Sequence, residues 1–87
     1  MYVIIVYDVE ENRVSKVCKF LRLYLHWIQN SVFEGNITES ELKKIKKELK
    51  SIIDKNYDSI LIFRMKDERY VDKEVIGIEK TEISRIV

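Results

Sequence analysis

The stretch Met1-Tyr-Val-Ile-Ile-Val-Tyr-Asp8 decides the fold, because six consecutive apolar or aromatic residues end abruptly in a carboxylate. A short, uninterrupted apolar run is typical of a strand that is buried on both faces. The carboxylate of Asp8 would then lie at the end of a rigid element, where a metal-binding or catalytic acid can be held accurately. One alternative stays open, since Asp8-Val-Glu-Glu11 also fits a helix N-cap followed three residues later by an acid.

Length and composition indicate one small domain. The chain has 87 residues, no proline and two glycines, and no linker or low-complexity tract. Its apolar runs are far shorter than the ~20 residues of a membrane span, and the N-terminus lacks the basic region of a signal peptide. The single cysteine, Cys18, excludes an internal disulfide and fits a packed position on a helix. We therefore expect a cytoplasmic protein with no membrane partner.

The expected elements follow from periodicity and turn signals. In chain order they are a strand over 2–8, an amphipathic helix over 12–25, a strand over 27–34, a helix opened by the capping box Thr38-Glu-Ser-Glu41, a strand over 59–65 and a strand over 74–79. Residues 82–87 could add a short fifth strand. This set fits an α+β, ferredoxin-like β-α-β-β-α-β fold over residues 1–87, with a core at 1–78 and a tail at 79–87.

The predicted fold leaves an apolar surface uncovered. In a ferredoxin-like fold both helices lie on one face of an antiparallel sheet whose first and third strands are central. We assign 2–8 and 59–65 to these central positions, because both are apolar on two sides. An exposed apolar face is a liability for a monomer, and a self-complementary two-fold dimer removes it. We therefore expect a homodimer that packs sheet against sheet, with the C-terminal tail extending the partner's sheet.

The net charge of +1 does not by itself indicate a nucleic-acid partner, so the distribution of charge matters more. Between Asn12 and Ser31 there is no acid, and this basic excess is the best nucleic-acid signal in the chain. The bases of the predicted first helix are Arg13, Lys16, Lys19 and Arg22. An ordinary solvated helix face explains the same pattern. The second helix carries more lysines, but its acids temper them.

The strand end Tyr7-Asp8, then Arg13, then Gln29-Asn-Ser-Val-Phe-Glu-Gly35 together resemble the small CRISPR-associated endoribonuclease family. That family is also the non-integrase subunit of the spacer-acquisition complex. The resemblance covers residues 1 to about 78, and the combination of the two motifs at this separation is fairly specific.

The resemblance implies a homodimer with a ferredoxin-like fold in the cytoplasm of a prokaryote, acting in defence against foreign nucleic acid. It implies a divalent metal, Mg²⁺ or Mn²⁺ in its place, held by the aspartate that matches Asp8. The implied substrates are single-stranded RNA and, in some members, double-stranded DNA. The implied partners are two integrase dimers in a heterohexameric complex. A metal-dependent endonuclease and a non-catalytic adaptor that binds duplex DNA and integrase both fit, and a ferredoxin-like regulatory domain is a third possibility.

Individual residues then receive roles as expectations. Asp8 is the expected catalytic residue and metal ligand. Tyr7 could stack on a base, because aromatic stacking contributes roughly 1–3 kcal/mol per base. The family places Ser31 and Phe33 near the site, with Ser31 as a phosphate or water contact. For Tyr7 and Phe33 the alternative is a place in the core. With the four bases of the first helix, these residues form the expected nucleic-acid surface.

Overall fold

The described residues fold into one sheet with two α-helices on a single side. A computed structural model describes residues 1–80. Within these residues the elements are, in chain order, β1 (Tyr2–Asp8), α1 (Glu11–Leu21), β2 (His26–Gln29), β3 (Val32–Asn36), α2 (Glu39–Ile52), β4 (Ser59–Met65) and the 3₁₀ helix η1 (Glu68–Tyr70). The order β-α-β-β-α-β confirms the predicted ferredoxin-like fold, although the individually predicted elements followed the order β-α-β-α-β-β.

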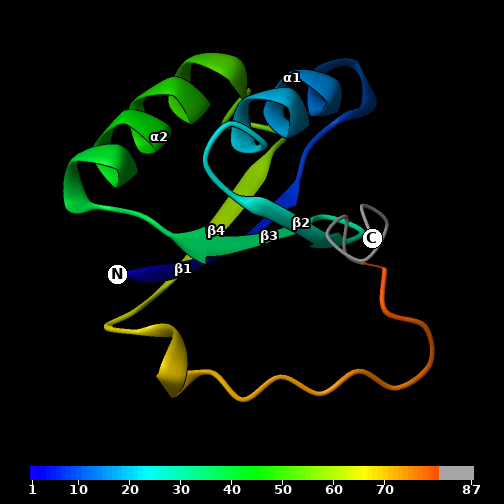
Figure 1. Ribbon diagram of the computed structural model, residues 1–87. Coiled ribbons are helices and arrows are strands. Elements are labelled where there is room, and N and C mark those ends of the chain that lie inside the picture. Colours follow the sequence, from blue (N-terminus) through cyan, green and yellow to red (C-terminus); the bar gives the residue numbers. More distant parts are fainter. Residues whose placement is uncertain (81–87) are drawn as a thin grey trace.

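The sheet has the strand order β2-β3-β1-β4, and every neighbouring pair is antiparallel. Both helices cover the same face of it (Figure 1). β1 lies between β3 and β4, so that Ile5 is opposite Phe33 on one side and Ile62 on the other. This central position explains why β1 has no polar residue before Asp8.

The core fills the space between the sheet and the helices. Val3, Ile5 and Tyr7 alternate along β1 toward the helices, and each is buried. The remaining members of the buried cluster are Val17, Leu21, Leu25, Phe33, Ile37, Leu42, Ile45 and Leu49. Each fully buried aliphatic or aromatic side chain of this kind contributes about 1.5–3 kcal/mol relative to an exposed one. Packing in this core therefore fixes both α1 and α2 against the same face of the sheet.

The opposite face of the sheet is largely apolar and is not covered by α1 or α2. Ile4 and Val6 of β1 and Val32 of β3 are only partly buried there, while Leu61 and Phe63 of β4 are 54% and 52% exposed. The segment that follows β4 runs on this side of the molecule (Figure 1). The uncovered apolar face on which we based the dimer is therefore present in the described residues.

The strand predicted over 27–34 is two strands, which corrects that interpretation. β2 and β3 form a hairpin whose two-residue turn is Asn30-Ser31, and Asn30 has a φ of 44°. Asparagine tolerates this left-handed conformation better than most residues. The indole N–H of Trp27 donates to the carbonyl oxygen of Asn30 at 3.0 Å and holds the turn. The first helix also ends earlier than predicted, at Leu21, because turns follow it.

Two further predictions about strands were wrong. Residues 74–79 form no strand, since they are exposed and Gly77 has a φ of 95°, which interrupts an extended run. β4 is not central, because within residues 1–80 it pairs with β1 alone and forms one edge of the sheet. The predicted strand over 82–87 lies outside the described residues. Across the described range, neither helix has the length and apolarity that spanning a bilayer requires.

The capping box predicted for α2 is confirmed. The hydroxyl of Thr38 accepts a hydrogen bond from the N–H of Glu41 at 3.1 Å, and the carboxylate of Glu41 accepts one from the N–H of Thr38 at 2.9 Å. Two N–H groups at the helix start, which would otherwise lack partners, are thereby satisfied.

We predict that Thr38→Ala lowers the free energy of unfolding by about 1 kcal/mol, because the N–H of Glu41 loses its acceptor. Thr38→Ser is the matched control, since it keeps the hydroxyl. Urea unfolding followed by circular dichroism at one protein concentration measures both variants. Equal stability of Thr38→Ala and wild type would show that the cap does not contribute.

Candidate metal and nucleic-acid site

Asp8 is the last residue of the central strand β1, and its side chain is exposed. It lies opposite Ser59 at the start of β4. The N–H of the preceding Tyr7 donates to the carbonyl oxygen of Ser31 at 3.0 Å, so the β2–β3 turn lies next to this strand end. In the described part of the chain the carboxylate of Asp8 has no hydrogen-bond or ion-pair partner. It is therefore free to accept a cation.

The alternative that Asp8 caps the first helix is not observed. α1 begins at Glu11, its N-cap residue is Glu10, and no side chain caps it. The N–H of Glu10 instead donates to a distant side chain, since Asp58 Oδ1, directly before β4, accepts it at 3.0 Å.

Asp58 connects three segments of the chain around this strand end. Its completely buried carboxylate accepts Arg13 Nε at 2.6 Å, Arg13 Nη2 at 2.9 Å and the N–H of Asp54 at 2.8 Å, besides the N–H of Glu10. A buried carboxylate is costly without such partners. Asp58 therefore joins the exit of α2 and the start of β4 to the loop between β1 and α1.

The hydrogen bonds from Arg13 hold the pKa of Asp58 far below its ordinary value, although burial acts in the opposite direction. The backbone N–H groups of Glu10 and Asp54 lower the pKa further. Asp58 is therefore a carboxylate at any physiological pH.

Arg13 was predicted to contact nucleic acid, and the structure places its guanidinium on Asp58. The Arg13 side chain is 20% exposed and lies 3.6 Å from Glu10 Oε2 as well. No role was predicted for Asp58. A lone acid directly before an apolar strand was the available signal, but nothing in the sequence identified its partner 45 residues earlier.

The two aromatic residues predicted to face nucleic acid are in the core. Tyr7 is 5% exposed, and its hydroxyl contacts Cys18 Sγ at 3.0 Å. Burial and this contact raise the pKa of Tyr7. Phe33 is fully buried, and its ring centroid is 6.0 Å from that of Tyr7. Because neither ring presents a face to solvent, the structure favours the core alternative for both.

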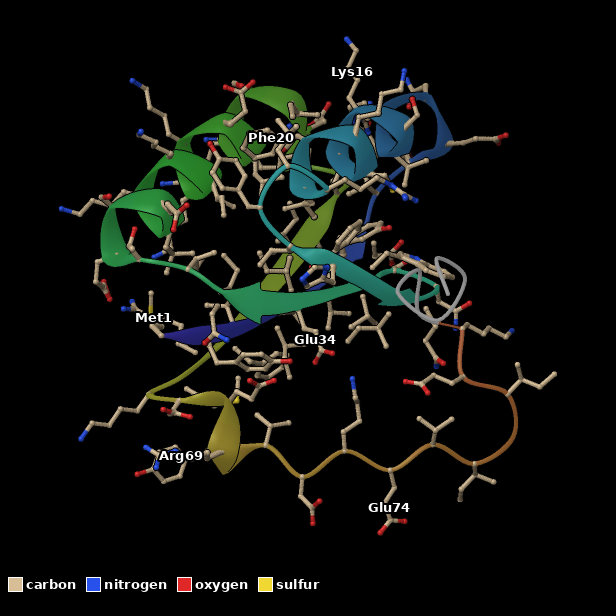
Figure 2. All side chains as sticks on the ribbon, viewed as in Figure 1. Met1, Lys16, Phe20, Glu34, Arg69 and Glu74 are labelled. Carbon is tan, nitrogen blue, oxygen red and sulfur yellow. The ribbon has the colours of Figure 1, made fainter. Side chains whose placement is uncertain are left out.

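The predicted bases of α1 are separated from Asp8. Lys16 and Lys19 are exposed and border a depression between the two helices, and Figure 2 shows Lys16 pointing into solvent. Arg22 is exposed just after the helix. Asp8 alternates with Tyr7 along β1, so it belongs to the other face of the sheet. The structure therefore places the backbone of Ser31 beside Tyr7, the residue before Asp8, and leaves these bases on the helix side. Their nucleic-acid role stays a prediction.

The donor set fits a magnesium ion that is only partly held by one chain. Among residues 1–80 no group of three or more histidine, cysteine, aspartate or glutamate side chains could enclose a metal. Mg²⁺ commonly takes one or two carboxylates and fills its other positions with water and phosphate oxygens. The single exposed carboxylate of Asp8 matches that preference.

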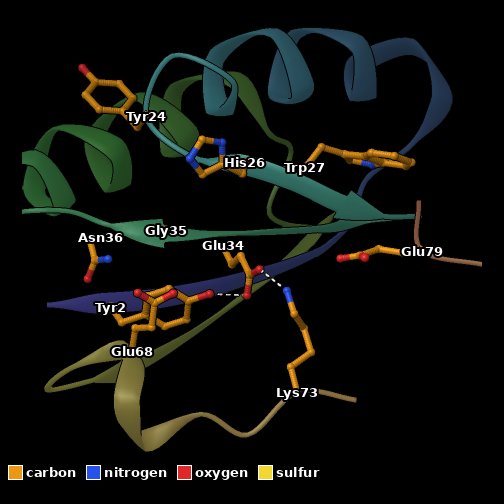
Figure 3. Close-up of a pocket in the computed structure, with 10 residues that line it drawn as sticks. All are labelled: Tyr2, Tyr24, His26, Trp27, Glu34, Gly35, Asn36, Glu68, Lys73 and Glu79. Atoms are coloured by element: carbon orange, nitrogen blue, oxygen red, sulfur yellow. Dashed lines mark hydrogen bonds and ion pairs between the residues drawn. The ribbon is translucent and has the colours of Figure 1, made fainter. Parts of the chain in front are cut away.

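A second polar cluster, at the far end of the same sheet face, was not predicted. Figure 3 shows Glu34 accepting the hydroxyl of Tyr2 and pairing with Lys73, whose Nζ is 2.5 Å from Glu34 Oε2. The cluster borders a cavity of about 490 Å³. Burial, followed by the bond to Glu34, raises the pKa of Tyr2. These groups satisfy one another, and they attach the segment after η1 to β3.

Comparison with known proteins agrees with this fold. The family model of the CRISPR associated protein Cas2 matches residues 1–73. A CRISPR-associated endoribonuclease Cas2 from Pyrococcus furiosus is 49% identical over 87 residues, with both chains fully covered. Its counterpart from Methanothermobacter thermautotrophicus is 45% identical, covering all of this chain and 96% of that one.

Two solved structures share the architecture. A crystal structure of cas2 has a TM-score of 0.85 and 44% identity, covering 92% of this chain and 90% of that chain. Streptococcus pyogenes Cas2 at pH 6.5 has a TM-score of 0.77 and 35% identity, covering 88% and 100%. The fold and these matches together define a small CRISPR-associated protein of ferredoxin-like architecture. Within that class, the chain belongs to the CRISPR associated protein Cas2 family, which confirms the resemblance.

We predict that Asp58 makes the free energy of unfolding depend on pH only in the acidic range. Its pKa is lower in the folded than in the unfolded state, so its contribution is complete above the unfolded pKa of about 4 and is lost as pH falls below it. Urea midpoints of wild type and Asp58→Asn, measured from pH 2 to 7, should therefore differ by a constant amount above about pH 5 and converge below pH 4. Parallel curves through pH 3 would contradict this assignment.

Proposed function

We propose that this protein is a Mg²⁺-dependent endoribonuclease that cuts single-stranded RNA, with Asp8 as the metal ligand. Relatives that match the whole chain at 45–49% identity are named endoribonucleases. The observation that carries the proposal is the exposed carboxylate of Asp8, without a partner in residues 1–80, at the end of a central strand. Manganese would replace magnesium, since both accept oxygen ligands.

Each residue near Asp8 has a distinct task in this proposal. A bound Mg²⁺ supplies polarisation of a phosphoryl oxygen and a lower pKa for an attacking water. The strand holds the carboxylate at a fixed position, and the pairing of Asp8 with Ser59 sets the face from which it projects. Ser31, in the adjoining turn, has a hydroxyl suited to a phosphate or a water. Duplex DNA is the second substrate to test.

We also propose that the protein works as a homodimer through the uncovered face of the sheet. Leu61 and Phe63 are half exposed on an otherwise apolar surface, and burial of such a surface drives association. Asp8 projects from the same face, because it alternates with Tyr7 and follows Ile4 and Val6. Two-fold packing would therefore bring two Asp8 carboxylates toward a shared axis and complete one metal site.

A second candidate function is a non-catalytic adaptor that binds duplex DNA and integrase dimers in spacer acquisition. The specific observation that favours it is the exposed lysine surface of α2, on which Lys43, Lys46, Lys47 and Lys50 border one shallow depression. In a dimer this surface occurs twice, which suits the regular charge of a nucleic-acid backbone. The predicted role of the tail, 79–87, in partner contacts falls mostly outside the described residues.

We predict that Asp8→Asn abolishes Mg²⁺-dependent cleavage of single-stranded RNA, with a fall of at least about 100-fold in kcat, because the metal loses its carboxylate. Glu11→Gln is the matched control, since Glu11 is another exposed acid three residues away. Identically purified proteins are assayed on labelled RNA and on duplex DNA, with Mg²⁺ and with EDTA.

Equal rates for Asp8→Asn and wild type would remove Asp8 from the mechanism. If neither protein cleaves and both bind duplex DNA with a steep salt dependence, the adaptor function replaces the nuclease.

We predict that Phe63→Glu converts a dimer to a monomer at micromolar concentration, because it places a charge on the apolar face. Leu23→Glu is the control, since Leu23 is 75% exposed on the helix side of the molecule. Sedimentation velocity measures both. A monomeric wild type at micromolar concentration would overturn the dimer.

A further inference from the structure

We infer that Asp58 is a positioning residue for Asp8, acting through the backbone of the loop between β1 and α1. This inference rests on the function proposed above, because it concerns the geometry of the same metal ligand. It assigns a role in the reaction to a residue whose side chain is fully buried.

The carboxylate of Asp8 receives no side-chain support within residues 1–80, so the backbone alone sets its direction. That backbone is anchored on both sides of Asp8. Before it, the N–H of Tyr7 donates to the carbonyl oxygen of Ser31. After it, the N–H of Glu10 donates to Asp58 Oδ1 at 3.0 Å. Of these two anchors, only the second has a side chain as its acceptor.

Asp58 is suited to this task because its own position is fixed by four donors. Arg13 contributes two of them, and the N–H of Asp54 contributes a third, besides the N–H of Glu10. The carboxylate is fully buried, so water cannot take its place when it is removed. A change at Asp58 therefore releases the loop that follows Asp8, while the pairing of Asp8 with Ser59 remains.

The expected size of the effect follows from the precision that metal chemistry requires. Residues that orient a metal ligand typically change metal affinity or activity by about 10- to 100-fold when they are mutated. A misplacement of about 1 Å in a reacting group has an effect of about 100-fold on rate. A purely structural role for Asp58 would instead lower stability and leave the folded protein fully active.

The test compares wild type with Asp58→Asn, using Arg64→Gln as the matched control. Arg64 also forms an arginine–carboxylate pair, with Glu39, but this pair is exposed and lies at the other end of β4. All measurements are made at a temperature at which circular dichroism shows each protein folded. The probe for the metal is Mn²⁺ alone, titrated without RNA and detected by electron paramagnetic resonance.

We expect Asp58→Asn to weaken Mn²⁺ binding by about 10- to 100-fold and to lower kcat similarly, with KM for RNA within about twofold of wild type. In metal-free protein, the amide of Glu10 should exchange its hydrogen faster than in wild type. Arg64→Gln should match wild type in all three measurements. Arg13→Lys keeps the charge but not the paired donors, and should give an intermediate loss.

Unchanged Mn²⁺ affinity and kcat in folded Asp58→Asn would overturn the inference and leave Asp58 a stabilising residue only. Unchanged protection of the Glu10 amide from hydrogen exchange would overturn the inference as well, whatever the measured activity. If Asp58→Asn does not fold, Arg13→Lys decides the question by the same measurements. Absence of Asp8-dependent cleavage and Mn²⁺ binding in wild type would instead contradict the proposed function, while the exchange measurement would still report on the anchor.

Discussion

The structure depends on one constraint: β1 is apolar on both faces, but α1 and α2 cover only one face of its sheet. Val3, Ile5 and Tyr7 are buried in the core between the sheet and the helices. Ile4 and Val6, which alternate with them, belong to the face that neither α1 nor α2 covers. The dimer that we propose would resolve this imbalance, and it would also set where two copies of the strand-end acid lie.

Asp8 and Asp58 show how environment assigns different tasks to the same side chain. Asp58 is fully buried, accepts four hydrogen bonds and carries a counter-ion, so its negative charge is compensated within the chain. Asp8 is exposed and, within the described range, lacks any such compensation. The first maintains the geometry, and the second is left with a charge that an external cation can neutralise.

Much of the fold could be predicted because it rests on local signals. The apolar run of β1 and the capping box at Thr38 each depend on neighbouring residues, and both are confirmed. The hairpin at Asn30 was missed because a two-residue turn without glycine resembles a continuing strand. The position of β4 at the sheet edge was missed because an apolar run does not indicate whether a strand pairs with one neighbouring strand or with two.

The candidate site, too, could be predicted only where it depends on local sequence. Asp8 could be found because its position at a strand end is visible in eight residues of sequence. The partnership of Arg13 with Asp58 could not, since it joins residues that are distant in the chain and depends on tertiary packing. Helical spacing likewise groups Arg13 with Lys16 and Lys19, although the first is engaged in the interior and the other two are on the surface.

The central position of β1 has a consequence for how the chain is made. Synthesis begins with β1, yet its second neighbour, β4, is complete only when the ribosome reaches Met65. Until then β1 can pair with β3, but its other edge stays open, and closing that long loop slows folding. Open edges of apolar strands pair readily with other chains. The nascent protein is therefore most prone to aggregation after α1 and α2 have formed and before β4 emerges.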